Sequence, residues 1–345
     1  MKFGPVPVAQ AAGCVLAHSL RLPECVLKKG RVLSADDVIV LQAAGVPQVV
    51  VVQLHTDDVP EDQAAAQLAA ALCGEQARCT KATTGRANLL ALAPGLVLLD
   101  AARIHAINAV HESLTVATLP AFEPVVSGQM LATIKVIPYA VPRAALAQVL
   151  HLAQGDVPAV SIAAFVPLRV GRVLTRLSDT RESILDKMRT AVVQRLQPLQ
   201  AQLQVECTVD HDEQAVALAL RQMTAAGDVD VVLISGIAAT VDRADVVPAG
   251  LVAAGGQVLH AGMPVDPGNL LVLGSLPGAA GLCPVVGLPT CARSPKLNGF
   301  DFVLRRLAAR LPVTARDIMQ MGVGGLLTEI ETRPMPRAAL TDRMT

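Results

Sequence analysis

A regular alternation of apolar and amphipathic segments, starting near residue 168, constrains the fold of this chain more than any other feature. The segment "DVDVVLISG" (228–236) is almost wholly apolar, which is typical of a strand with helices on both faces of its sheet. The strand-like segments "RVGRVLT" and "LQVECTV" precede it, and a helical pattern follows each of them. The first of these helices is expected to open with Asp179 and Glu182 as a cap-like pair. The alternation predicts an α/β fold, with a doubly wound sheet in a three-layer α/β/α arrangement.

The first part of the chain has a different, mixed pattern of short strands and helices. "LSADDVIVLQAAGVPQVVVV" predicts a helix that is capped by Ser34, ended by Gly45 and followed by a strand. "FEPVVSGQMLATIKVIPYAVP" predicts a β-hairpin that turns at Ser127 and Gly128.

Prolines at positions 138 and 142 mark the end of this mixed pattern. We therefore expect four parts: a smaller mixed α+β N-terminal region at 1–140, a connecting segment at 141–167, the α/β domain at 168–311 and a C-terminal tail at 312–345. The tail is expected to form a short helix and then to lose order toward its polar end.

The composition excludes several classes of protein. The chain has 345 residues, enough for two domains, and 52% of them are hydrophobic, which is too many for a disordered chain. Lys and Arg total 29, Asp and Glu also total 29, and aromatic residues make up only 2%. Because nucleic-acid-binding proteins need a basic surplus and usually stacking aromatics, we expect no nucleic-acid partner.

Membrane segments and disulfides are not expected either. No apolar run reaches the roughly 18 residues that a membrane span requires, and the start of the chain lacks the apolar run of a signal peptide. The seven cysteines include no C-x-x-C pair, which argues against a disulfide framework and a zinc knuckle. We expect a cytoplasmic, reduced protein without a membrane partner.

Ligands of doubly wound sheets bind beyond the carboxyl ends of the strands, and the first loop expected there is "SGIAATVDRAD" (235–245). Gly236 lets a backbone approach a ligand closely. Asp242 and Asp245 have two interpretations. Acids near the start of a helix stabilise it through its dipole by a few tenths to ~1 kcal/mol. Alternatively, the two carboxylates orient polar ligand groups or a hydrated cation, and because they would repel a phosphate, a phosphate should bind elsewhere.

The second loop is "HAGMPVDPGNLL" (260–271). Its residues Asp266 to Asn269 are typical of a type I or type II turn, which by itself explains them as a plain hairpin connection. His260 lies just before this turn, and a lone histidine near a strand end is usually structural.

The third loop is "GLPTCARSPKLNGFD" (287–301). Ser294 followed by proline fits the start of a helix, as cap and first turn. With Arg293 and Lys296 beside it, the serine hydroxyl and the free helix N–H groups predict an anion site, for example for a phosphate. The alternative is an ordinary capped helix with solvated charges. Cys291 is interpreted as a loop thiol.

Taken together and in this order, the three loops resemble the molybdopterin-binding domain of the molybdenum insertase family, the bacterial MoeA and gephyrin type. The family pattern is S-G-G-x-S-x-G-x-x-D, then M-K-P-G-K-P, then G-L-P-G-N-P. The resemblance covers residues 168–311 well and residues 1–52 loosely. It implies a MoaB/Mog-type α/β domain that binds molybdopterin, a pterin with a dithiolene and a terminal phosphate.

The match can be followed residue by residue. Positions of this chain that fall on the motifs are Ser235, Gly236 and Asp242, then Pro267 and Gly268, then Gly287, Leu288 and Pro289 with Ser294 near the end. Asp245 takes the place of the later acid of the first motif. The departures are Ile237 and Val241 for two glycines, Asp266 and Asn269 for two lysines, and Thr290 and Cys291 for Gly-Asn. Where the family has S-T-G-D-E-L, this chain reads "RLSDTRESILDK", so the resemblance implies pterin binding more directly than molybdate insertion.

The stretches "SILDK", "VDRADVVP", "MPVDPGN" and "CARSPKLNGFD" are most similar to a divergent group of molybdopterin-binding proteins. In that group a similar domain can be joined to a cytidylyltransferase that matures the cofactor for xanthine dehydrogenase-type enzymes. The nucleotidyltransferase signature L-A-A-G-x-S-x-R-M does not occur in this chain. The resemblance therefore implies a separate cofactor nucleotidyltransferase or a molybdoenzyme as partner, and a tendency to form homo-oligomers.

The leading hypothesis is a protein that binds molybdopterin or the molybdenum cofactor during cofactor biosynthesis or maturation. The expected binding residues are Ser235, Gly236, Asp266, Pro267, Gly268, Pro289, Arg293, Ser294 and Lys296. Among them Arg293, Ser294 and Lys296 would hold the phosphate. Asp242 and Asp245 would face the pterin or a metal–oxo end, and Asp266 would contact the amino groups of the pterin.

The second hypothesis is an active molybdopterin molybdenumtransferase that inserts molybdate into adenylylated molybdopterin. Asp242 and Asp245 would then be catalytic, with Asp245 as a metal ligand, for example to Mg²⁺. Whether the protein is an enzyme stays open at this point.

Two hypotheses come from other classes. A nicotinamide oxidoreductase is disfavoured, because the glycine cluster "GVGGLL" (322–327) follows a helical pattern and not a strand. An interaction module would use residues 1–140 to dock a maturation partner.

Overall fold

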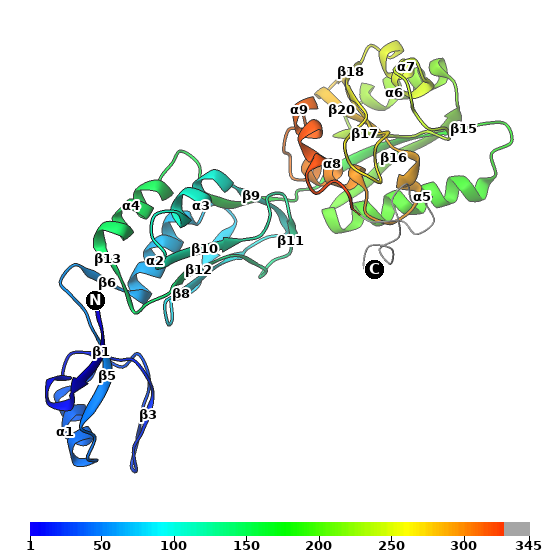
Figure 1. Ribbon diagram of the computed structural model, residues 1–345. Coiled ribbons are helices and arrows are strands. Elements are labelled where there is room, and N and C mark those ends of the chain that lie inside the picture. Colours follow the sequence, from blue (N-terminus) through cyan, green and yellow to red (C-terminus); the bar gives the residue numbers. More distant parts are fainter. Residues whose placement is uncertain (328–345) are drawn as a thin grey trace, which may run out of the picture. The chain divides into compact units, whose positions relative to one another are not determined.

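The computed structural model describes residues 1–327 and divides the chain into two compact units, Met1–Ala164 and Phe165–Thr345. Both units contain helices and strands, and this mixed content agrees with the expected α/β class (Figure 1). Among residues 1–327, no helix is both long and apolar enough to cross a membrane.

The first 53 residues of unit 1 form a small sheet and one helix. The sheet has the strand order β1-β5-β2, with bounds β1 (Lys2–Pro7), β2 (Val15–Leu16) and β5 (Gln48–Gln53), while β3 (Leu20–Arg21) pairs with β4 (Val26–Leu27). The helix α1 (Ala35–Ala43) starts as predicted, because Ser34 and Asp37 form a reciprocal capping box. Gly45 follows its end with a φ of 72°, in the left-handed region that glycine tolerates best.

Residues 58–164 build the remainder of unit 1 around one hydrophobic cluster. The elements are β6 (Asp58–Pro60), α2 (Glu61–Leu72), β7 (Ala77–Cys79), β8 (Arg86–Ala91), β9 (Gly95–Leu99), α3 (Ala101–Asn108), β10 (Leu114–Thr118), β11 (Pro124–Val125), β12 (Met130–Val136), β13 (Ala140–Pro142), α4 (Arg143–Ala153) and β14 (Val160–Ala164). The strands make three sheets, ordered β10-β12-β8-β7, β11-β9-β14 and β13-β6.

The hairpin predicted around Ser127 and Gly128 is wrong. β11 pairs with β9, and β12 pairs with β10 and β8, so the two arms belong to different sheets. The reason lies in the turn itself, because Gly128 N donates to Ala91 O at 2.8 Å and Ala91 N donates to Gln129 O at 2.8 Å. These bonds fix the turn to the end of β8 and carry the chain from one sheet to the next.

Residues 141–164, expected to belong to a connecting segment, instead form β13, α4 and β14 of unit 1. β14 completes the sheet of β9, and the side chains of Leu146 and Val149 on α4 are buried in the same cluster as Leu68 and Leu72 of α2. Because the apolar face of α4 packs into the core of unit 1, this helix belongs to that unit. The division between the units therefore lies between Ala164 and Phe165 rather than near residue 140.

Unit 2 contains a six-stranded sheet with the order β16-β15-β17-β20-β19-β18. Its elements are β15 (Leu168–Arg176), α5 (Glu182–Leu196), β16 (Ala201–Asp210), α6 (Glu213–Ala225), β17 (Val231–Ser235), α7 (Val246–Ala253), β18 (Gln257–Ala261), β19 (Val272–Gly278), β20 (Gly281–Gly287), α8 (Gly299–Ala308) and α9 (Ala315–Met319). Strand β15 is parallel to β16 and β17, and β17 is parallel to β20. Strand β19 runs antiparallel to both of its neighbours, so the expected strict alternation ends after α7.

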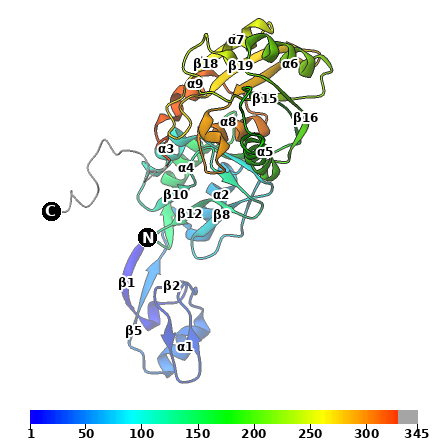
Figure 2. The same ribbon diagram turned by 90° about the vertical axis from the view of Figure 1, so that its right-hand side faces the viewer.

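Helices cover both faces of this sheet (Figures 1 and 2). Val173 of β15 packs in one cluster with α6 and α7, whereas the next residue, Leu174, packs against Leu185 and Met188 of α5. Because successive side chains of a strand point to opposite faces, α6 and α7 lie on one face and α5 on the other. Helix α8 lies beside α5, joined to it by an ion pair between Arg195 and Asp301.

The helix α5 begins differently from the prediction. Its N-cap is Arg181, without a side-chain cap, and Asp179 lies outside the helix. Leu177 and Thr180 close a turn just before it, with Leu177 N donating to Thr180 Oγ1 at 2.8 Å and Thr180 N donating to Leu177 O at 3.0 Å. This turn occupies the place where the cap-like pair was expected.

The predicted C-terminal tail falls partly outside the described residues. Its first part forms α9 and a short 3₁₀ turn, Gln320–Gly322, in agreement with the expected short helix. The glycine cluster at 322–327 follows this turn and not a strand. The expected loss of order concerns residues 328–345, which lie outside the described part of the chain.

Candidate functional site at the carboxyl edge of the sheet

The three loops singled out in the sequence leave the same edge of the unit 2 sheet. Strands β17 and β20 are parallel, and β18 has the same direction because β19 is antiparallel to both β20 and β18. Their carboxyl ends are Ser235, Gly287 and Ala261. Residues 236–245, 262–271 and 288–298 therefore start from one edge, which is where open α/β sheets bind ligands.

The first and third loops are in direct contact through Arg293. Its Nη2 donates hydrogen bonds to Gly236 O at 3.1 Å and to Ile237 O at 2.6 Å. The side chain is half-buried, and burial lowers the pKa of the guanidinium. Two carbonyl oxygens thus hold the cation in a fixed orientation at the end of β17.

A small cavity lies where these two loops meet α5. Its lining residues are Met188, Val192, Ser235, Gly236, Leu288, Pro289, Thr290, Ala292 and Arg293. Its volume is about 10 Å³, which is room for about one water molecule. A larger ligand can therefore place only a terminal oxygen in the cavity while this edge keeps its observed form.

Two of the residues that line this cavity each have a buried polar atom without a partner in the described part of the chain. Within the described part of the chain, Ser235 Oγ and Arg293 Nε are buried and make no hydrogen bond. A buried donor without a partner costs roughly 1–3 kcal/mol, so such groups call for an explanation. A hydroxyl and a cationic N–H at one cavity fit an anionic oxygen, such as that of a phosphate.

The second loop meets the third at the start of α8. Gly299 N donates to Pro267 O at 2.8 Å. Gly268 has a φ of 142°, and a Cβ there would lie only 2.6 Å from Gly299 N. Asp266 is held through its backbone by the last described residues, because its N donates to Gly325 O and its O accepts from Leu327 N. Asp266 does not line the cavity of Ser235 and Arg293.

The two aspartates of the first loop fold their own loop. Asp245 Oδ2 accepts from Val241 N at 2.6 Å and from Asp242 N at 2.8 Å, and Asp242 Oδ1 accepts from Ala244 N at 2.8 Å. The backbone hydrogen bonds to Asp245 lower the pKa of its carboxyl. Among residues 1–327 there is no group of three or more His, Cys, Asp or Glu side chains that could hold a metal ion.

Sequence reasoning missed a threonine–histidine pair at the same edge. Thr175, fully buried at the end of β15, accepts a hydrogen bond from Ile237 N at 2.9 Å and lies 2.9 Å from His211 Nδ1. Burial lowers the pKa of His211, and the charge of Asp245 acts against this shift. The pair joins the carboxyl ends of β15, β16 and β17, where the strand order reverses. The sequence contained one signal for this pair, because His211 comes directly after a predicted strand.

Ser294 does not start a helix, contrary to the prediction. It follows a 3₁₀ turn (Thr290–Arg293), and α8 begins at Gly299 after Asn298, which forms a capping box with Asp301. Ser294 and Lys296 are exposed, and Lys296 N donates to Ser294 Oγ at 3.3 Å. The free helix N–H groups expected beside Ser294 are therefore absent from that position.

The buried Arg195 of α5, also missed, explains this local structure. Its Nη1 donates to Ala292 O at 3.0 Å, and its Nη2 donates to Ser294 O at 2.6 Å and Lys296 O at 2.9 Å. With these carbonyls bound to a side chain, the segment stays non-helical up to residue 298. Arg195 thereby positions the loop that carries Arg293.

Comparisons with known proteins match only parts of this chain or match it weakly. A family model described as a domain of unknown function (DUF8806) matches residues 5–53. No curated protein matches the chain.

Two of the solved structures that are similar to the chain are molybdenum cofactor biosynthesis proteins by their titles. One is a "Molybdenum cofactor biosynthesis protein from Pyrococcus furiosus", with 14% identity and a TM-score of 0.25, over 90% of this chain and 64% of that one. The other is a "Putative molybdenum cofactor biosynthesis protein from Corynebacterium diphtheriae", with 11% identity and a TM-score of 0.24, over 47% of this chain and 99% of that one. This chain thus spans 64% of the length of the Pyrococcus protein. The TM-scores are too low for either likeness to carry an argument.

Proposed function

We propose that this protein binds molybdopterin or the molybdenum cofactor at the carboxyl edge of the unit 2 sheet, in the biosynthesis or maturation of that cofactor. The proposal includes a three-layer, doubly wound MoaB/Mog-type architecture for unit 2. Its support is the ordered resemblance of the three loops to the insertase motifs, together with their common edge in the sheet.

One observation carries the proposal: Ser235 and Arg293 line one cavity, and Ser235 Oγ and Arg293 Nε are buried without a hydrogen-bond partner among residues 1–327. A phosphate oxygen that reaches this cavity would accept hydrogen bonds from both atoms. Because Arg293 Nη2 is already bound to Gly236 O and Ile237 O, the guanidinium is oriented before the ligand arrives. Preorganised, charge-assisted hydrogen bonds of this kind are about twice as strong as neutral ones.

The other expected residues take different places in the proposal. Gly236 and Pro289 line the cavity, so the ligand would contact them beside the phosphate. Ser294 and Lys296, both exposed, would contact the outer part of the ligand. Asp266, Pro267 and Gly268 would contact the pterin from the second loop.

The test begins with mass spectrometry of any pterin that remains bound to the native protein, followed by titration of purified full-length protein with molybdopterin. Arg293→Gln is expected to weaken binding by about tenfold or more, and Ser235→Ala by several-fold. Arg78→Gln, which changes an exposed arginine of unit 1, is the matched control and should bind as the parent protein does. Absence of pterin binding, or equal binding by all variants, would sink the proposal.

An active molybdenumtransferase is the second candidate, and the charge interaction between His211 and Asp245 favours it. In this hypothesis the Asp245 carboxylate would bind Mg²⁺, and the His211 imidazole would lie within electrostatic reach of it. Adenylylated molybdopterin and molybdate are supplied together, and nucleotide release is measured in the parent protein, Asp245→Asn and Asp242→Asn. Release that depends on Asp245 supports the enzyme, whereas binding without release leaves only the binding function.

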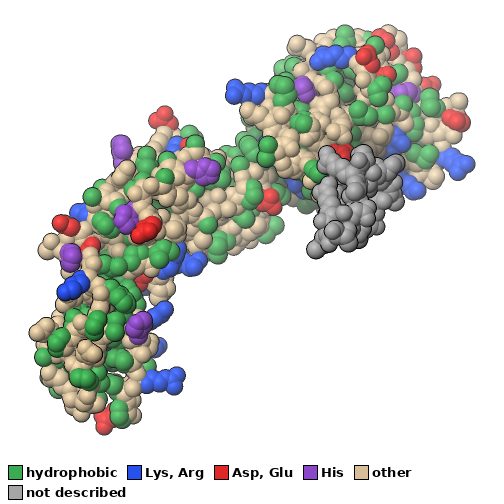
Figure 3. All heavy atoms as spheres, in the orientation of Figure 1, with side chains coloured by type: hydrophobic (Ala, Val, Ile, Leu, Met, Phe, Trp, Pro, Cys, Tyr) green, Lys and Arg blue, Asp and Glu red, His purple; other side chains and the backbone are tan. Residues whose placement is uncertain are grey.

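The cellular context belongs to the same proposal. We propose a cytoplasmic protein that passes its ligand to a separate cofactor nucleotidyltransferase or to a xanthine dehydrogenase-type molybdoenzyme, and that can self-associate. Lys and Arg side chains are interspersed with Asp and Glu on the face of unit 2 in Figure 3, which gives no support to a nucleic-acid partner. Co-purification with the two candidate partners and size-exclusion chromatography test these statements.

A further inference from the structure

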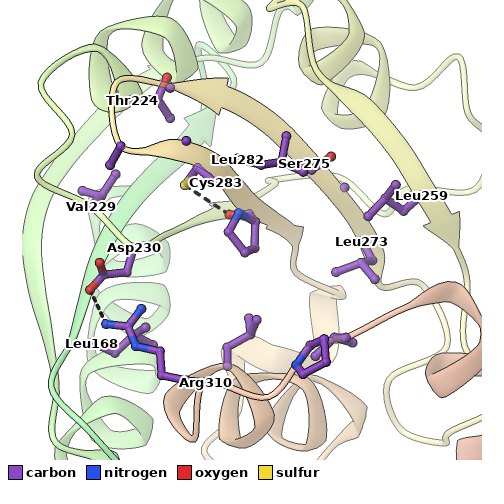
Figure 4. Close-up of a pocket in the computed structure, with 18 of the residues that line it drawn as sticks. Leu168, Thr224, Val229, Asp230, Leu259, Leu273, Ser275, Leu282, Cys283 and Arg310 are labelled. Carbon is purple, nitrogen blue, oxygen red and sulfur yellow. Dashed lines mark hydrogen bonds and ion pairs between the residues drawn. The ribbon is translucent and has the colours of Figure 1, made fainter.

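A second, larger cavity opens at the opposite edge of the same sheet and extends along the sheet to Leu259 and Leu273 (Figure 4). Its volume is about 500 Å³. The amino end of β15 at Leu168, the residues before β17, the turn between β19 and β20, and the chain that leaves α8 surround it. It shares no lining residue with the small cavity of Ser235 and Arg293.

Small residues leave this space open. Gly227, Gly278, Ala280 and Gly281 line the side formed by the β19–β20 turn. At Gly278 a Cβ would lie 2.9 Å from Thr224 O, so that side accepts no larger side chain without a shift. Most of the remaining wall is apolar, with the leucines Leu168, Leu259, Leu273, Leu282, Leu307 and Leu311. The volume and the apolar wall are typical of sites for small molecules.

The charged residues that line the cavity are Asp230 and Arg310. The carboxylate of Asp230 is fully engaged: Oδ1 lies 2.9 Å from Arg169 Nη2, and Oδ2 accepts from Arg169 N at 2.7 Å and from Arg310 Nη2 at 3.0 Å. Burial raises the pKa of this carboxyl, but the hydrogen bonds from Arg169 and Arg310 outweigh burial and hold the pKa to about 2. Asp230 is therefore ionised at neutral pH and has no need of a ligand.

Arg310 is engaged on one side only. Its Nη2 donates to Asp230 Oδ2 and to Pro167 O, both at 3.0 Å. In the described part of the chain, its Nη1 and Nε make no hydrogen bond, and the side chain is 48% exposed. Asp230 forms ion pairs with both Arg310 and Arg169, so it neutralises only part of the charge of Arg310. Arg169 is also influenced by the charge of Asp228, which does not line the cavity. Two N–H donors of Arg310 are thus free to bind an acceptor at the wall of an apolar cavity.

We infer that this cavity binds a small molecule with an apolar body and one carboxylate, such as a medium-chain aliphatic acid. The carboxylate accepts a charge-assisted hydrogen bond from one of the two free N–H groups of Arg310, at Nη1 or at Nε, while Nη2 stays bound to Asp230. The aliphatic chain lies among the leucines of the wall. Since the two cavities share no lining residue, one site can fail its test while the other passes.

The experiment titrates octanoate and, separately, octanol into the full-length protein by isothermal calorimetry. We expect octanoate to bind with one-to-one stoichiometry and more tightly than octanol. Arg310→Gln should weaken octanoate by about tenfold and leave octanol nearly unchanged, while Arg310→Lys should give an intermediate loss. Ala280→Trp, which fills the cavity from the turn between β19 and β20, should abolish binding of both compounds.

Thermal unfolding of each variant establishes that it is folded before binding is compared. Ser235→Ala is the control at the other edge and should bind octanoate as the parent protein does. No octanoate binding by the parent protein, equal binding by Arg310→Gln and the parent protein, or unchanged binding by Ala280→Trp would each overturn the inference.

Discussion

Arg195 of α5 and Asp301 of α8 form a buried ion pair in which Arg195 Nε lies 2.8 Å from Asp301 Oδ1. Asp301 also accepts the backbone N–H of Asn298, so the same carboxylate caps α8. The remaining donors of Arg195 bind the carbonyls of the loop that carries Arg293. One buried cation therefore connects the two helices on this face with the geometry of the candidate anion site.

Loss of Arg195 is predicted to destabilise the protein strongly. In Arg195→Leu the Asp301 carboxylate stays buried without its partner, and the free energy of unfolding should fall by roughly 3–5 kcal/mol. Urea unfolding measures this loss of free energy. The matched control is Arg176→Leu, which removes an exposed pair with Asp210 at 3.5 Å and should change stability by less than about 1 kcal/mol. Equal, small losses in both variants would contradict the structural role given to Arg195.

Gly268 is predicted to tolerate no side chain. In Gly268→Ala the new Cβ would lie 2.6 Å from Gly299 N, so the second loop and α8 must separate, at a loss of about 2 kcal/mol or more. Gly255→Ala is the control, because Gly255 also has a positive φ, 92°, but open space around its Cβ position. It should lose only about 1 kcal/mol. Similar losses for the two variants would show that the close approach at Gly299 has no effect on stability.

The pKa of Asp230 predicts a stability change at acid pH. The folded-state pKa of about 2 lies below the ordinary value of 3.8, so the ionised carboxylate stabilises the fold above pH 3.8, and this contribution is lost as the pH falls toward 2. Its size is roughly 2 kcal/mol. Unfolding measured from pH 7 to pH 2 should show this slope in the parent protein and not in Asp230→Asn. The exposed Asp210→Asn should keep the slope of the parent protein.

Two hydroxyl deletions at the carboxyl edge are predicted to change stability in opposite directions. Ser235→Ala removes a buried hydroxyl that has no partner in the described residues, and should raise the free energy of unfolding of the ligand-free protein by about 1 kcal/mol. Thr175→Val removes a buried hydroxyl that binds Ile237 N and His211, and should lower it by roughly 1–2 kcal/mol. A stability loss in Ser235→Ala would mean that the hydroxyl is paired, and would remove one support of the anion site.

Local sequence patterns predicted much of the fold. The capped helix after Ser34, the apolar strand ending at Ser235 and the succession of strands and helices from residue 168 all follow from short-range preferences. The common edge of the three loops followed from the general behaviour of parallel strands. These features depend on residues close together in the chain, and a single sequence contains that information.

What the sequence could not predict depends on distant partners. Ser294 and its proline are typical of a helix start, but Arg195, about one hundred residues earlier, binds Ser294 O and delays the helix. The turn at Gly128 is fixed by Ala91 of another strand, which turned a predicted hairpin into a crossing between sheets. The pairing of Thr175 with His211 likewise needs two strands to lie side by side.

The reversed direction of β19 has a consequence for both proposed sites. Because β19 runs against its neighbours, the loop before it begins at the edge where the three motif loops gather, and the turn after it, at Gly278–Gly281, closes at the far edge beside the leucine-walled space. Strand β19 thus lines the leucine-walled space and also connects it to the second motif loop. A one-residue slip of β19 against β20 would move the second motif loop and the wall of the larger cavity together, so the alignment of these two strands fixes the geometry of both.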